Sequence, residues 1–330
     1  MKKILCCLLF CSGVLSYAAA QENNTSMPVA NMFLAHKSEW SKTASVKELA
    51  AAIAAQTTDA EDQLRLLMLW MNNFLTVDEV KYNSGNYQPT GLDNIMKYRK
   101  AFGIDYAELT TAFCKELKIP CLNVLGYSKM KNYIAGSGFK EPNASWNLVK
   151  IKGQWYICDL FSSTQTMLNR SGFMSVLDTR YFMPDPARYI THAIPMDPAF
   201  QLLTNPISMQ SYTNAGLDAI DKSIHSLNSV DYTAYAEQTM KLSPAARAMR
   251  EAKAAYAYNP ANPNTLIVTY YNQGVDLARN SKATNEQLKQ AKSYLVKAKE
   301  LLQANTALPE VQALKEPCIK GIQYLNTIIK

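Results

Sequence analysis

The chain has 330 residues, a length that suggests about two domains. Hydrophobic residues make up 48% of the sequence and charged residues 18%, which is ample material for a core and excludes a largely disordered chain. The net charge of +7 is too small and too scattered to favour nucleic acid as a partner. With three histidines, a histidine-rich metal site is not expected, and no cofactor is predicted.

The first twenty residues have the pattern of a secretory signal. A pair of lysines near the start is followed by an apolar run over residues 4–14 and by alanines at 18–20. This run is too short for a stable membrane anchor, and no later stretch is long enough for a transmembrane helix. We expect residues 1–20 to be a signal peptide and the mature chain to be exported, to the periplasm or outside the cell. Lipid attachment at Cys11 is less favoured, because Phe10 suits the preceding position poorly.

Four cysteines follow this segment, without a CxxC pair or a dense disulfide framework. Three complete pairings are possible, and the sequence does not choose among them. Buried free thiols are the favoured interpretation. The four are Cys114, Cys121, Cys158 and Cys318.

Helices are predicted in the first third of the chain. Ser45 and Thr58 are each followed three residues later by a glutamate, a capping-box pattern at the start of a helix. The second of these helices should end near Phe74. Another should begin near Asp105, where apolar residues recur at helical spacing.

Strands are predicted next, over residues 121–127, 146–151 and 154–160. A Lys-Gly pair separates the last two and indicates a hairpin. Strict alternation would place Asp159 on the same face as Trp155, which is an unusual position for an acid.

The segment 182–206 contains five prolines, so we expect it to be rich in loops. We place a domain boundary near Ser208, which would divide the mature chain into residues 21–208 and 209–330.

The last part of the chain is predicted to be helical. Ser243 before a proline and Thr284 before a glutamine three residues later mark helix starts. Apolar residues at spacings of 3 and 4 form one stripe over residues 288–302. A final helical segment, 309–329, should be interrupted at Pro317. Such helix pairs are loosely similar to tetratricopeptide-type arrays, although no 34-residue repeat is visible.

A series of short motifs occurs in order over the region from about residue 60 to residue 206. They are Trp70–Phe74, Ala101–Leu109, Lys118–Tyr127, Ser145–Ile151, Gly153–Asp159, Phe182–Pro186 and Gln201–Leu203. Together they resemble the transglutaminase-like superfamily, and especially bacterial proteins related to kyphoscoliosis-type peptidases. The resemblance implies an α+β, papain-like core of N-terminal helices and an antiparallel sheet, followed here by an all-helical C-terminal domain.

In that family a cysteine, a histidine and an aspartate carry the chemistry, in this chain order. The cysteine opens a helix, where the helix dipole and the histidine favour its thiolate, and the aspartate orients the histidine. The family cysteine lies three residues before a Tyr-Ala pair, which is the position of Gly103. The histidine lies two residues before a Trp-Asn pair, which is the position of Ala144. The aspartate corresponds to Asp159.

Glycine supplies no nucleophile and alanine supplies no base. General acid–base catalysis alone contributes roughly 10²–10⁴-fold to a rate, and without a thiol this covalent route does not exist. We therefore expect a transglutaminase-like pseudoenzyme, in which Asp159 is a relic that now bonds a buried backbone group or Trp155.

A non-catalytic binding module is the favoured function. The cleft of the fold would remain and would bind a peptide, a protein or a glycan at the cell envelope. Its predicted lining residues are Asp105, Tyr106, Trp146, Asn147 and Asp159.

Two alternatives remain open. A relocated nucleophile, Cys114 or Cys158 paired with His192, would give an active cysteine hydrolase or acyl transferase, although packing in the core explains both cysteines. Alternatively, the chain is an architectural scaffold that assembles through its helical tail.

Overall fold

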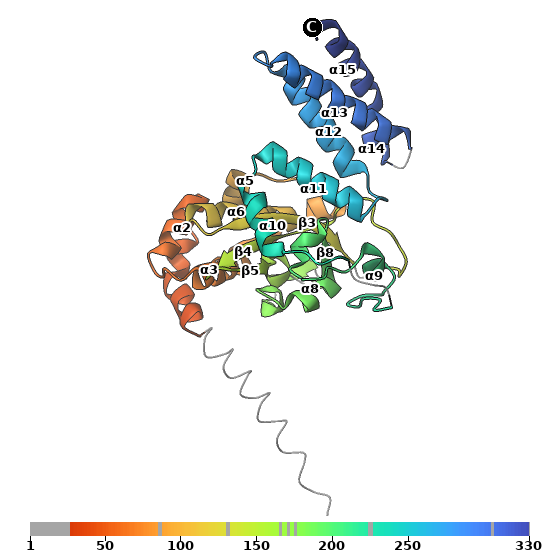
Figure 1. The fold of residues 1–330 in the computed structure, drawn as a ribbon. Helices are drawn as coiled ribbons and strands as arrows, with labels where there is room; N and C mark the ends of the chain where they lie inside the picture. Colours follow the sequence, from red (N-terminus) through yellow and green to blue (C-terminus); the bar gives the residue numbers. More distant parts are fainter. Residues whose placement is uncertain are drawn as a thin grey trace, which may run out of the picture. The chain divides into compact units, whose positions relative to one another are not determined.

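A computed structural model gives the fold of the protein (Figure 1). The residues that it describes are 27–84, 88–129, 133–164, 167–169, 172–174, 177–223, 227–304 and 307–329. The expected signal peptide over residues 1–20 lies outside them, as does Cys11, so cleavage and export stay predictions. Among the described helices, none combines the length and the apolar character needed to span a bilayer.

The chain forms two compact units, and each is described by itself. The first unit comprises Met1–Cys121, Lys150–Lys152 and Asp159–Phe182, and the second comprises Leu122–Val149, Gly153–Cys158 and Met183–Lys330. The domain boundary expected near Ser208 falls within the second unit and stays a prediction.

The first unit is mainly helical. After a helix over residues 27–40, its helices are α2 (Val46–Ala54), α3 (Ala60–Phe74), α4 (Glu79–Ser84), α5 (Leu92–Tyr98), α6 (Gly103–Glu116), α7 (Leu160–Thr164) and the 3-10 helix η1 (Thr179–Tyr181). Two short strand pairs complete it: parallel β1 (Thr76–Val77) and β2 (Lys100–Ala101), and antiparallel β6 (Met167–Asn169) and β7 (Gly172–Met174). Helix α6 packs against α2, α5 and α7, which places the start of α6 inside the unit.

Of the two helix caps predicted in this unit, one is confirmed and one is wrong. Ser45 caps α2, where its hydroxyl accepts a hydrogen bond from the backbone N–H of Glu48 at 3.1 Å. The expected cap of α3 at Thr58 is wrong by one residue. Asp59 caps this helix, because its carboxylate accepts from the backbone N–H groups of Glu61 and Asp62 at 3.0 and 3.2 Å.

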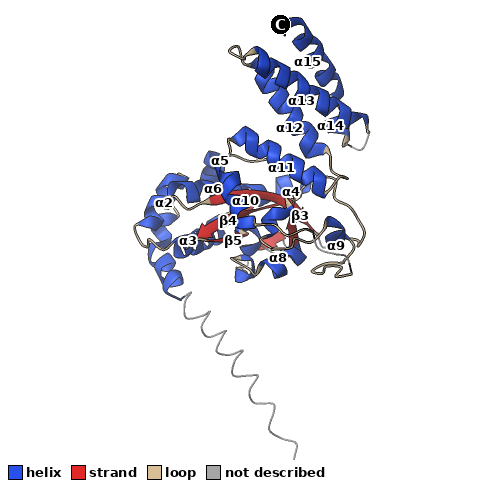
Figure 2. Ribbon diagram, in the orientation of Figure 1, coloured by secondary structure: helices blue, strands red, loops and turns tan. Residues whose placement is uncertain are grey.

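A four-stranded sheet, drawn in red in Figure 2, has the strand order β5-β4-β3-β8. The strands are β3 (Cys121–Ser128), β4 (Ala144–Ile151), β5 (Gln154–Cys158) and β8 (Ala193–Pro195). The predicted hairpin between β4 and β5 is confirmed: Lys152 and Gly153 form its two-residue loop, and both have positive φ, 49° and 87°. Strands β3 and β8 pair antiparallel. The expected α+β class is therefore confirmed.

The segment 182–206 is more regular than its prolines suggested. It contains α8 (Pro186–His192), β8 and the 3-10 helix η2 (Pro198–Gln201). The expectation of loops was wrong because an aspartate precedes two of the prolines, Pro186 and Pro198. Each aspartate caps a helix that begins with the proline, whose missing N–H costs nothing at that position.

The rest of the second unit is helical, as expected. It contains α9 (Met209–Thr213), α10 (Tyr232–Lys241), α11 (Pro244–Tyr258), α12 (Asn264–Arg279), α13 (Asn285–Gln303), α14 (Pro309–Gln312) and α15 (Lys315–Ile328). Ser243 and Thr284 cap α11 and α13, as the sequence predicted. The final segment is interrupted as expected, but the break lies at Ala313 and Leu314, between α14 and α15, and not at Pro317. Pro317 lies in the first turn of α15, where its missing N–H is tolerated.

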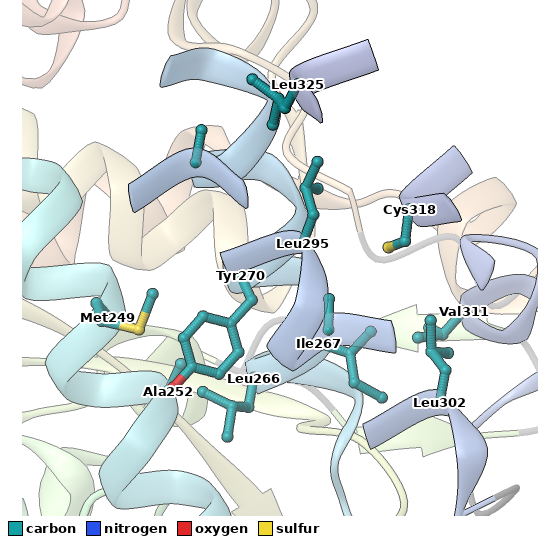
Figure 3. Close-up of a cluster of buried hydrophobic side chains, with 12 residues drawn as sticks. Met249, Ala252, Leu266, Ile267, Tyr270, Leu295, Leu302, Val311, Cys318 and Leu325 are labelled. Carbon is teal, nitrogen blue, oxygen red and sulfur yellow. The ribbon is translucent and has the colours of Figure 1, made fainter. Parts of the chain in front are cut away.

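The core of the C-terminal helices is built on the apolar stripe of α13 (Figure 3). Ala291, Leu295, Ala298 and Leu302 of this stripe are buried, and Leu288 is half-buried. They pack with buried residues of the neighbouring helices. These are Met249, Ala252, Leu266, Ile267, Tyr270, Val311, Cys318 and Leu325.

Candidate functional site

Gly103, the residue that we expect at the position of the family cysteine, is the first residue of α6. It is buried, and among the described residues a Cβ atom added to it would meet the Phe161 ring, at 3.8 and 3.9 Å. These are ordinary van der Waals distances, so the backbone here has room for a Cβ atom. The position lacks a reactive group because glycine has no side chain, and not because neighbouring atoms exclude a Cβ atom.

Phe161 links the start of α6 to the segment that carries Asp159. Its ring lies edge-on to the rings of Phe102 and Tyr106, with centroid distances of 5.3 Å to each. Since Phe161 follows Asp159 by two residues, the structure brings Gly103 and the Asp159 segment together within the first unit.

Asp159 does not lie on a strand, contrary to the expected alternation. Strand β5 ends at Cys158, and Asp159 is the residue before α7. Its Oδ1 atom accepts a hydrogen bond from the backbone N–H of Ser162 at 2.9 Å, which is the bond of a helix N-cap. The strand prediction failed because this capping bond turns the chain into α7. The carboxylate, 4% exposed, thus has a structural task of the kind that the sequence suggested.

Asp105, one of the predicted cleft residues, is held by several hydrogen bonds. Its carboxylate accepts from the backbone N–H of Phe102 (2.9 Å), from the N–H and hydroxyl of Thr90 (2.7 and 3.0 Å) and from the Lys81 ammonium (3.1 Å). The Asp105 side chain is fully buried, and that of Lys81 is 12% exposed. The carboxylate therefore links the start of α6 to the segment before α5. It has little hydrogen-bonding capacity left for a ligand.

Tyr106 is also directed into the first unit. It is 3% exposed, and burial raises the pKa of its hydroxyl well above the usual value, with the charge of Asp105 acting in the same direction. The phenol is therefore neutral at physiological pH and can serve only as a packing group or a hydrogen-bonding group.

Strand β4 carries the other half of the predicted site, in the second unit. Ala144, the residue that we expect at the position of the family histidine, is the half-buried first residue of this strand. Trp146 and Asn147 are 2% and 1% exposed. The Trp146 ring packs on Tyr189 at a centroid distance of 5.3 Å, and among the described residues its indole N–H has no hydrogen-bond partner.

Gly126 of β3 makes space for this indole. A Cβ atom at Gly126 would overlap with the Trp146 ring and with the carbonyl oxygen of Ile194. The close approach of β3 to the Trp146 ring and to Ile194 thus requires glycine at this position. Each of the five predicted cleft residues is buried, so their contact with a ligand stays a prediction.

The residues of the alternative mechanism lie in different units. Cys114 is buried in α6 of the first unit, whereas Cys158 ends β5 and His192 ends α8, both in the second unit. His192 packs edge-on against Tyr189, with a centroid distance of 5.8 Å. Catalysis by a Cys158–His192 pair stays a prediction.

Within the described residues, none of the four cysteines forms a disulfide bond. Cys114, Cys158 and Cys318 are buried, and Cys121 is half-buried, which agrees with the interpretation of packed thiols. In the part of the chain that the structure describes, no three His, Cys, Asp or Glu side chains gather as a metal-binding group.

The sequence reading missed Lys81 and Thr90. They complete the Asp105 network from 24 and 15 residues earlier in the chain. A buried carboxylate needs such partners. The position of Asp105 at the start of an apolar helix could therefore have indicated that partners from elsewhere in the chain were required.

Comparison with known proteins identifies the class of domain. Residues 47–160 match the transglutaminase-like superfamily. The match spans α2 to the start of α7 and includes Gly103, Ala144 and Asp159. The chain thus carries a transglutaminase-like domain with a papain-like fold, which is followed by a helical C-terminal region.

The curated relatives are much longer proteins. The kyphoscoliosis peptidase of Mus musculus is 25% identical over 172 residues, which are 52% of this chain and 26% of the relative. The kyphoscoliosis peptidase of Homo sapiens is 28% identical over 159 residues, or 48% and 24%. Hillarin of Drosophila melanogaster is 26% identical over 139 residues, or 38% and 17%. The chain therefore spans at most about a quarter of the length of these relatives.

One solved structure, described as the crystal structure of a TGase, is also similar. It has 16% sequence identity and a TM-score of 0.27, and the match covers 44% of this chain and 37% of that chain.

Proposed function

We propose that the protein is an exported, catalytically inactive member of the transglutaminase-like superfamily that binds a peptide, a protein or a glycan at the cell envelope. The observation that carries the proposal is Gly103. It begins α6, where a thiol would lie at a helix N-terminus and form a thiolate, and it has no side chain.

The surroundings of Gly103 support loss of the reaction with retention of the frame. Phe102, Tyr106 and Phe161 form a packed aromatic cluster around the helix start. The Asp105 network holds the first turn of α6 in place. A frame kept so well ordered without its nucleophile is suited to binding, because binding needs shape and not a thiolate.

The binding test uses the mature chain as bait in an extract of the cell envelope. Ala144→Trp places a large side chain at the half-buried start of β4 and should abolish retention of the bound component. Lys47→Trp, on the exposed face of α2, is the matched control and should retain it. If Ala144→Trp retains the same components as the unmodified chain, binding at this site is wrong.

A further inference from the structure

The C-terminal helices of the second unit carry a groove that the proposed function does not use. Its volume is about 710 Å³, which lies within the range of ligand pockets in proteins. Helices α12, α13 and α15 all contribute to it. Its apolar lining residues are Val275, Ala278, Leu288, Leu295, Tyr324 and Ile328.

Leu295 forms a firm floor because two glycines let the neighbouring helices approach it. A Cβ atom at Gly274 of α12 would lie 2.9 Å from the Leu295 side chain, and one at Gly321 of α15 would lie 2.6 Å from it. Real Cβ atoms do not come so close. A larger residue at either glycine would therefore force the Leu295 side chain or its helix to move. The groove is therefore shaped by close helix packing and not by a loose surface.

The rim of the groove is positively charged. Arg279 and Lys320 line it and are exposed, and no Asp or Glu belongs to the lining. Neither cation takes part in the ion pairs found among the described residues. Arg279 lies in the last turn of α12, where it suits the helix dipole, but Lys320 is not in the last turn of α15 and has no such explanation.

Tyr324 adds an exposed aromatic ring to this rim, with 55% of its surface accessible. Aromatic residues and arginine are enriched where proteins bind one another, and they often dominate the binding energy. The groove thus combines apolar lining residues, an exposed aromatic ring and two exposed cations that form no ion pair with another described residue.

We propose that this groove binds an acidic amphipathic helix of another protein. The apolar residues of the helix, spaced at i, i+3 or i+4, and i+7, would cover the exposed Tyr324 and the half-buried lining residues Val275, Leu288 and Ile328. Its carboxylates would pair with Arg279 and Lys320. Charge argues against a second copy of this chain, which has a net charge of +7, and against residues 1–20, which carry two lysines and no acid. The proposal does not depend on the missing thiol, so either idea can fail alone.

Two blocked, fluorescein-labelled peptides test the charge preference by fluorescence anisotropy with the full chain. The acidic probe is AELLEQLAELLEQA, and the basic probe, AKLLKQLAKLLKQA, has the same apolar pattern. The acidic probe should bind about tenfold or more tightly than the basic probe, and its affinity should fall between about 50 mM and about 500 mM NaCl. Equal binding of the two probes, or no binding of either, would overturn the proposal.

Variants then locate the binding. The double variant Arg279→Glu/Lys320→Glu should weaken binding of the acidic probe about tenfold, because two attractive pairs become repulsive. Lys97→Glu, an exposed lysine on α5 in the first unit, is the matched control and should change nothing. Tyr324→Ala should weaken both probes without removing the preference for acid. Circular dichroism of each variant checks the fold.

Two further results would contradict the proposal. One is undiminished binding of the acidic probe by a folded Arg279→Glu/Lys320→Glu variant. The other is a concentration-dependent dimer of the unmodified chain that Lys320→Glu dissociates, which would show that a second copy occupies the groove.

Discussion

A Cβ atom at Gly103 would lie 3.8 Å from the nearest atom of the Phe161 ring, at ordinary contact distance. The start of α6 therefore has room for a Cβ atom, whereas Gly126 on β3 does not. The packing thus requires glycine at position 126 but not at position 103.

The contrast predicts opposite effects of one substitution. Gly103→Ala should leave the free energy of unfolding unchanged or raise it by up to about 1 kcal/mol, because alanine restricts the unfolded chain and fits the folded one. Gly126→Ala should lower it by about 1–3 kcal/mol or more, because the new methyl group overlaps with Trp146 and with a backbone oxygen. Urea denaturation of both variants checks this, and a larger loss for Gly103→Ala than for Gly126→Ala would contradict the described packing.

Asp159 offers a test of its capping role. Asp159→Ala should lower the free energy of unfolding by about 1 kcal/mol, because the N–H of Ser162 loses its partner. Asp159→Asn should recover most of that loss, because asparagine caps a helix nearly as well as aspartate. Thermal or urea unfolding measures both. An asparagine variant no more stable than the alanine variant would show that the carboxylate charge, and not the cap, is what matters.

Loss of the Lys81–Asp105 pair should destabilise the first unit strongly. Asp105→Ala should lower the free energy of unfolding by about 3–5 kcal/mol, because it leaves the Lys81 ammonium without its buried partner. The control is Glu61→Ala, which removes a more exposed ion pair to Arg65 and should cost at most about 1 kcal/mol. Similar losses in the two variants would rule out a special role for the Asp105 network.

Glu251 should make the stability of the chain depend on pH. Burial raises the pKa of this carboxyl to about 7, with Asp197 acting in the same direction and Arg247 and Arg250 opposing it. Between the ordinary carboxyl pKa and about pH 7 the folded chain then binds a proton that the unfolded chain has released, so stability falls as the pH rises through this window.

The matched variant is Glu251→Gln, which cannot titrate. The stability that the unmodified chain loses between about pH 5 and about pH 8, by up to about 3 kcal/mol from this group, should be much reduced in the variant. Chemical denaturation at a series of pH values measures the difference. If the free energies of unfolding of the two proteins change with pH in parallel, the raised pKa of Glu251 in the folded chain is wrong.

Local signals in the sequence predicted much of the fold. The capping residues Ser45, Ser243 and Thr284 and the Lys-Gly hairpin act within a few residues of themselves, and all four were located correctly. Thr58 was mistaken for a cap because the neighbouring Asp59 competes for the same backbone N–H groups.

The remaining features depend on contacts distant in sequence. Asp105 is held by Lys81 and Thr90, and the residues around Asp105 form no pattern that predicts these two partners. The contact of Phe161 with the start of α6 likewise exists only in the folded unit. The positions expected for the catalytic residues could be counted from adjacent motifs, but the burial of those positions could not be predicted.

The most direct test of the central claim is the rate at which the purified chain joins a labelled primary amine to a glutamine-containing peptide, or hydrolyses that peptide. A chain without a thiol nucleophile should show no rate above the buffer blank, and Cys114→Ser and Cys158→Ser should change nothing. A measurable rate that disappears on replacing either cysteine alone would contradict the account and identify the protein as an active thiol enzyme.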